Sequence, residues 1–126
     1  MATGILVLAA LGALSAFVVA VSAVRAAGPE TLVVESWRMF GFLVFAGVFL
    51  LLAYRPRQYP GIWELVIFHK AAVASFLAVV GSEAIDGTSA AIADGVLAIA
   101  LVVAYLLIGG YRSWDRLRRP VAGRDD

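Results

Sequence analysis

The residues that could carry chemistry are the few ionisable side chains that fall inside or beside long apolar stretches of the sequence. Charged groups are costly within a membrane helix, so each is a candidate functional group. The candidates for acid–base catalysis are Glu64, His69, Lys70, Glu83 and Asp94. We expect Asp94 or Glu83 to act as the acid and His69 or Lys70 as a stabilising or relaying base.

Glu64, His69 and Lys70 belong to one apolar segment but do not share a helix face. At 100° per residue, His69 lies about 140° and Lys70 about 240° around the helix from Glu64. A site built from these groups therefore needs side chains from a second helix. The apolar residues on the same face as His69 are Ile62, Val66, Val73 and Phe76. Those on the same face as Lys70 are Trp63, Ile67, Ala74 and Leu77.

Two environments are open for Lys70. Either its ammonium is buried and paired with an acid from another helix, or its long stem carries the charge back to the cytoplasmic interface. Asp94 is the first choice of partner by charge, but the two residues would differ by roughly 10 Å along the helix axis. Direct pairing would then need a bridging water or an off-register packing of the helices.

A structural role is also open for the other candidates. Asp94 would suit the first turn of a helix, where an acid complements the helix dipole and Thr88 or Ser89 would serve as the cap. Glu64 would be solvated near the cytoplasmic interface. His69 would be a hydrogen-bonded packing residue rather than a proton carrier, because a lone group makes no site.

The outer end of the same segment carries Glu83 and Asp86, whose i, i+3 spacing puts them on one helix face. This acid pair would form a cation-binding mouth, face a pocket, or belong to a solvated loop.

No cofactor or metal is expected. The chain has no Cys and one His, which excludes a thiolate zinc site, an iron–sulfur cluster and a haem held by two histidines. Motifs of serine hydrolases, zinc proteases and nucleotide-binding loops are absent as well.

The composition places these residues in a membrane. Of 126 residues, 63% are hydrophobic and 15% are charged, whereas soluble domains average about half apolar and a quarter charged. The mean hydropathy is +0.95. A net charge of +1 argues against a nucleic-acid partner. The expected partners are the lipid bilayer, a lipophilic ligand, and a second copy of the chain or a larger membrane complex.

Four apolar segments are each long enough to cross a hydrocarbon core of about 30 Å as a helix. They predict an all-α integral membrane protein, with a bundle of four transmembrane helices over 1–112 and a basic cytoplasmic tail over 113–126. We expect the first segment to be retained rather than cleaved as a signal peptide, because Met1–Gly4 contains no basic residue. The predicted spans are 5–24, 37–54, 61–82 and 90–111.

The arginines in the connections predict that both termini are cytoplasmic, in a multi-pass protein of the cell (inner) membrane. Lys70 is left out of this comparison because it lies within a span. Arg25 alone, directly after the first span, favours the opposite insertion, so dual topology stays open. The arginines expected inside are Arg55, Arg57, Arg112, Arg116, Arg118, Arg119 and Arg124, and those outside are Arg25 and Arg38.

Small residues recur every three or four positions on the first span and on one face of the third. Such stripes are typical of close helix–helix contact. We expect an intramolecular seam of the bundle, and an oligomer seam is the alternative. The stripes are Ala9, Ala13, Ala16, Ala20, Ala23 and Ala27 on the first span, and Ala71, Ser75, Ala78 and Ser82 on the third.

Aromatic residues gather near the predicted span ends, as is typical of the membrane–water interface. A ligand cage is the alternative interpretation. These residues are Trp37, Tyr54, Tyr59, Trp63, Tyr111 and Trp114.

The sequence is compatible with three kinds of function. The first is a protein that binds a lipophilic small molecule in a pocket within the bundle and transforms it by acid–base chemistry, as an isomerase or cyclase would. The second is a dimeric transporter for small molecules or ions. Small multidrug transporters have a similar size and helix count, but they keep an essential acid in the first helix, where this chain has no charge. The third is an accessory subunit of a membrane complex.

Overall fold

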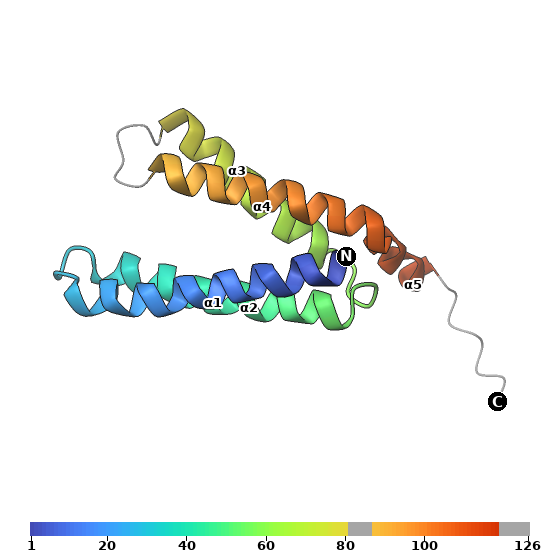
Figure 1. Ribbon diagram of the computed structural model, residues 1–126, viewed down its shortest axis with the longest axis horizontal. Coiled ribbons are helices and arrows are strands. Elements are labelled where there is room, and N and C mark those ends of the chain that lie inside the picture. Colours follow the sequence, from blue (N-terminus) through green and yellow to red (C-terminus); the bar gives the residue numbers. More distant parts are fainter. Residues whose placement is uncertain (81–86, 119–126) are drawn as a thin grey trace. The chain divides into compact units, whose positions relative to one another are not determined.

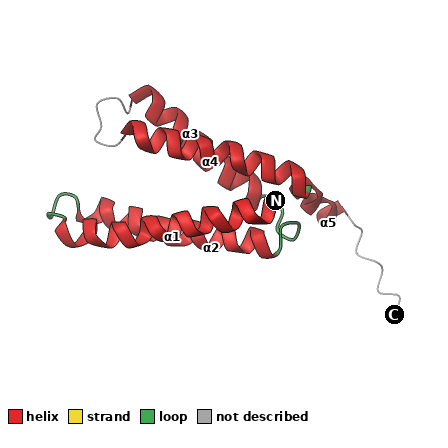
Figure 2. Cartoon of the chain, in the orientation of Figure 1, coloured by secondary structure: helices red, strands yellow, loops and turns green. Residues whose placement is uncertain are grey.

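The structure is a computed structural model that describes residues 1–80 and 87–118 of the chain. Within these residues it is all-helical, without strands (Figure 2). Four helices are long and apolar enough to cross a membrane, which confirms the four apolar helical spans predicted from the sequence. They are α1 (Ala2–Ala26), α2 (Leu32–Tyr54), α3 (Ile62–Val80) and α4 (Gly87–Ile108). The short 3-10 helix η2 (Gly110–Trp114) and the single turn α5 (Asp115–Arg118) follow.

The helices form two hairpins (Figure 1), one in each of the chain's two compact units. In the first unit, residues 1–54, α1 packs along α2. In the second, from Arg55 onward, α3 packs along α4, and η2 contacts both α4 and α5. The single four-helix bundle expected from the sequence stays a prediction.

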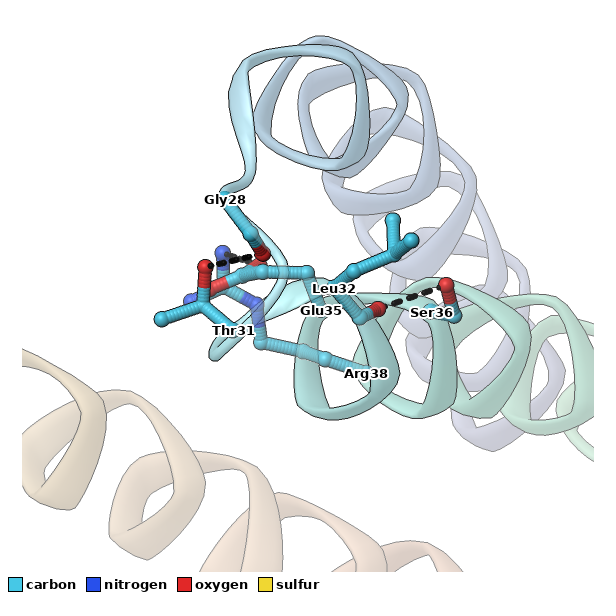
Figure 3. Close-up of polar contacts among 6 residues, drawn as sticks. All are labelled: Gly28, Thr31, Leu32, Glu35, Ser36 and Arg38. Atoms are coloured by element: carbon cyan, nitrogen blue, oxygen red, sulfur yellow. Dashed lines mark hydrogen bonds and ion pairs between the residues drawn. The ribbon is translucent and has the colours of Figure 1, made fainter.

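A hydrogen-bonded turn joins α1 to α2 (Figure 3). The Gly28 carbonyl accepts hydrogen bonds from the backbone N–H groups of Thr31 and Leu32, both at 3.0 Å. The Thr31 hydroxyl donates to the same carbonyl at 3.4 Å. Directly after the turn, Arg38 forms an ion pair with Glu35, at 2.5 Å. The turn therefore ties α1 to the start of α2 through bonds local in the sequence.

The small-residue stripe of α1 faces inward. All six of its alanines are buried or half-buried, which supports the intramolecular seam predicted for this helix. On α3, Ala71, Ser75 and Ala78 are exposed, so this stripe does not form the seam with α4 and its role stays a prediction. Ser82 lies outside the described residues. The helix turns a different face to α4, centred on the buried side chains of Trp63 and Lys70.

The helix ends differ by a few residues from the predicted spans, and the two differences in α4 bear on the site. Helix α4 begins at Gly87 rather than near residue 90, so Asp94 lies about two turns inside the helix. The expectation that Asp94 is a first-turn acid is therefore wrong. The helix ends at Ile108 rather than at residue 111, because Gly109 has a φ of 69° and leaves the right-handed helical region. The turn at Gly109 starts η2, which brings Trp114 back toward the start of α3.

Candidate functional site

Lys70 and Asp94 form a direct ion pair between α3 and α4. The distance from Lys70 Nζ to Asp94 Oδ1 is 2.8 Å. Lys70 is only 8% exposed, which confirms the buried, paired environment and excludes snorkelling as its conformation. Of the two routes to pairing expected from the sequence, a bridging water is therefore not used.

The lysine stem itself spans the offset between the two residues. A methyl group at Gly95 would lie 3.7 Å from the Ala74 Cβ, so these two residues are level with each other. In an antiparallel pair, Asp94 is then level with Ser75, five residues or about 7.5 Å beyond Lys70. The four-carbon stem of Lys70 covers this distance by running along the interface toward the C-terminal end of α3.

Glu64 accepts two hydrogen bonds on one carboxylate oxygen. The Tyr105 hydroxyl donates to Oε1 at 2.6 Å, and the Trp114 Nε1 donates to the same atom at 2.9 Å. The other oxygen, Oε2, is buried and has no hydrogen-bond partner among the described residues. Glu64 is thus half-buried and hydrogen-bonded by residues from α4 and η2, rather than fully solvated as expected.

Aromatic rings surround this carboxylate. Trp63 is fully buried, and its Nε1 donates to the Pro56 carbonyl at 2.7 Å. Its ring centroid lies 5.7 Å from that of Tyr105, which in turn lies 6.2 Å from that of Tyr111. Trp63 therefore packs within the protein, whereas the sequence predicted that it faces lipid headgroups. Trp114 and Tyr111, which were assigned to the same interface, are 41% and 49% exposed.

Three backbone features position the rings and Glu64. Gly61 precedes α3 with a φ of 85°, a conformation that suits glycine. At Gly110, a methyl group would lie 2.5 Å from Tyr105 Cδ2 and 3.0 Å from Trp63 Nε1, so only glycine allows this close approach. The Arg57 Nε donates to the Ile108 carbonyl at 2.7 Å, which fixes the loop before α3 to the end of α4.

Of the remaining candidates, His69 is the one that lies among the described residues, and it is near enough to Lys70 and Asp94 to interact with their charges. The His69 side chain is exposed on another face of α3, as expected from the helix geometry. Glu83 and Asp86 lie outside the described residues. In the part of the chain that is described, no three His, Asp or Glu side chains gather as a possible metal site.

The sequence analysis missed the role of Tyr105 and Trp114 as partners of Glu64. Tyr105 stands well inside an otherwise apolar stretch, and this was a usable signal, because a buried tyrosine hydroxyl generally has a hydrogen-bond partner. Trp114 follows a Gly-Gly pair that ends the helix, and its position depends on the turn made there.

The site contains two polar levels with different chemistry. At Lys70 and Asp94 the opposite charges neutralise each other within the interface. At Glu64 a carboxylate receives only neutral donors and keeps one oxygen available as an acceptor. A carboxylate in this state can take a hydrogen bond or a proton from a bound molecule.

Protein-family models, curated proteins and solved structures were each searched with this chain, and none of the three comparisons gave a match.

Proposed function

We propose that this chain is a membrane protein that binds a lipophilic small molecule on the α3–α4 hairpin, with Glu64 holding its polar end. The observation that carries the proposal is the buried Glu64 Oε2, which lacks a hydrogen-bond partner among the described residues while Oε1 has two. Buried polar atoms are hydrogen-bonded in the large majority of cases, and an exception calls for a missing partner.

The location of Glu64 favours an amphiphilic molecule as that partner. Glu64 lies in the first turn of α3, at one end of a helix long enough to cross a bilayer. A molecule whose polar head reaches Glu64 would leave its apolar part at the depth of the hydrocarbon. The aromatic rings of Trp63, Tyr105 and Trp114 supply the apolar surroundings that such ligand sites use.

Acid–base transformation of this molecule is the finer form of the proposal, and it rests on Glu64. Lys70 and Asp94 neutralise each other, so their pairing favours a structural role over proton transfer. An isomerase-like or cyclase-like reaction needs one positioned group that gives or takes a proton. Glu64 is the described carboxylate whose surroundings suit that task.

A second candidate function is that of a subunit, either in a homodimer, including a dimeric transporter, or in a larger membrane complex. The observation that favours it is the exposed small-residue face of α3, formed by Ala71, Ser75 and Ala78. Helices associate in lipid through such faces because the backbones can approach closely. Cross-linking through a cysteine at Ser75 tests this function.

We further propose that the chain resides in the cell (inner) membrane with both termini in the cytoplasm. The excess of arginine at the predicted inner connections supports this orientation. Helix-end residues Arg57 and Arg112 would then lie at the cytoplasmic interface together with Glu64.

Binding is tested with the full chain in a neutral detergent. Trp37→Phe limits the tryptophan signal to Trp63 and Trp114, which flank Glu64. Dodecylammonium, dodecanol and dodecanoate are then titrated as amphiphiles of equal chain length. We expect at least one of them to change the fluorescence saturably, and lipid extraction of the purified chain to yield a retained small molecule. If no probe saturates and no molecule is retained, the binding function is wrong.

A further inference from the structure

We propose that the ligand's polar head is a protonated amine, bound as a cation by the Glu64 carboxylate and the surrounding aromatic rings. This inference rests on the binding function proposed above and assigns the chemical class of the ligand. It follows from three features of the site: its charge, its open acceptor and its rings.

The charge of Glu64 lacks a counter-ion among the described residues. Asp94, the other acid of this helix pair, has Lys70 at 2.8 Å. Glu64 has only the neutral donors of Tyr105 and Trp114. An opposite charge would stabilise the half-buried Glu64 carboxylate, so the site can accept one cation.

Among the described side chains, Arg57 and Arg112 contact other groups. The Arg57 Nε donates to the Ile108 carbonyl at 2.7 Å. The Arg112 guanidinium carbon lies 5.9 Å from the centroid of the Tyr111 ring. Neither arginine forms an ion pair with Glu64, and a ligand is therefore the natural source of the cation.

Glu64 Oε2, the acceptor without a partner, requires a head group that donates hydrogen bonds. Oε2 accepts hydrogen bonds and cannot donate while the carboxylate is ionised. An ammonium group provides three donors together with its charge. A second carboxylate would add a like charge, and an alcohol would supply a donor without a counter-charge.

The rings favour a cation as well. Tyr105 lies within 6.2 Å of Tyr111 and 5.7 Å of Trp63 between ring centroids. Faces of such rings attract cations, and Arg112 already lies over the Tyr111 ring. Trp114 and Tyr111 are partly exposed. We therefore expect an amine to reach Glu64 when these two side chains move, while the backbone stays folded.

The test compares head groups on the full chain carrying Trp37→Phe, near neutral pH and in a neutral detergent. The probes are dodecylammonium, dodecanol and dodecanoate. We expect dodecylammonium to half-saturate at a concentration about tenfold lower than either of the others. Glu64→Gln removes the charge and keeps the side-chain shape, and it should abolish this preference. The matched control is Asp115→Asn, which removes an exposed acid next to Trp114 and should retain it.

Each outcome separates the amine assignment from the binding function. If dodecanol binds as tightly as dodecylammonium, or dodecanoate binds more tightly, the ligand is not an amine although the binding function stands. If Asp115→Asn loses the preference for dodecylammonium as fully as Glu64→Gln does, the amine is attracted by the net charge of the region and not by Glu64, and the assignment is wrong. If no probe saturates, the binding function itself fails. The head-group comparison on the chain with native Glu64 decides the question even if Glu64→Gln does not fold.

Discussion

The Lys70 ammonium lies 2.8 Å from the Asp94 carboxylate across the α3–α4 interface, with Lys70 almost fully buried. In the proposed membrane location, the pair joins two helices at a depth where a single charge would be costly. Each partner has an apolar analogue of similar size. Single and double substitutions can therefore distinguish the cost of an unpaired charge from the contribution of the ion pair itself.

Replacing one member of this pair should destabilise the hairpin strongly. Lys70→Met or Asp94→Leu alone leaves a buried charge without its partner, at a cost of about 3 kcal/mol. The double substitution should recover most of this loss, since no charge then remains. The measurement is reversible unfolding in mixed micelles, followed by circular dichroism. Glu35→Gln, which breaks the more exposed Glu35–Arg38 pair, serves as control and should cost less than about 1 kcal/mol.

The hydrogen bond from Tyr105 to Glu64 should be measurable in a double-mutant cycle. Tyr105→Phe removes one donor from a charged acceptor, and we expect a loss of about 2 kcal/mol in the same unfolding assay. In a Glu64→Gln background the same change should cost clearly less, because the acceptor is then neutral. Tyr59→Phe, at an exposed tyrosine, is the matched control and should be nearly neutral. Equal costs in both backgrounds would show that the two side chains are not coupled.

Gly110 should not accept even a methyl group. Gly110→Ala would place its Cβ 2.5 Å from the Tyr105 ring, and Glu64 and Trp63 hold that ring in place. We expect a destabilisation of about 1–3 kcal/mol, with a shift of the tryptophan emission. Gly47→Ala meets no neighbour within 4 Å and should be neutral or slightly stabilising, because alanine favours the helix. An unchanged stability of Gly110→Ala would contradict the close packing at this turn.

The proposed orientation can be tested by cysteine labelling, since the chain contains no cysteine of its own. Glu30→Cys lies in the turn between α1 and α2, and Leu117→Cys lies in α5. With both termini in the cytoplasm, a membrane-impermeant maleimide should label Glu30→Cys in intact cells and Leu117→Cys only after permeabilisation. Labelling of both positions in intact cells would indicate dual topology, and the reversed pattern would overturn the proposal.

The helices could be predicted from hydropathy because a bilayer admits few other backbone structures. The residues of α3 that pack on α4 share one helix face in the sequence, although the packing seam was predicted on another face, that of Ala71, Ser75 and Ala78. Trp63 and Lys70 are buried and Ile67, Ala74 and Leu77 are half-buried in the structure, and these residues were grouped by the helical period alone. Which residues share a face follows from the helical period of one helix, whereas the face that packs depends on the partner helix.

The pairings between helices could not be predicted in the same way. Hydropathy places the start of a helix only within a few residues, and three residues at the start of α4 moved Asp94 from the first turn to the interior. The register of α3 against α4 depends on the Gly95–Ala74 contact and on the turn at Gly109. For this reason the charges of Lys70 and Asp94 were recognised as partners, whereas the reach of the lysine stem was not.

In the proposed membrane location, the ion pair would affect how the chain enters the bilayer. Entering alone, α3 or α4 would carry a charged residue at a cost of about 2.5–3.5 kcal/mol near the helix centre. Entering together, the two segments can neutralise each other before they meet lipid. For a chain in this location, we therefore expect α3 and α4 to enter the bilayer together, as one paired unit.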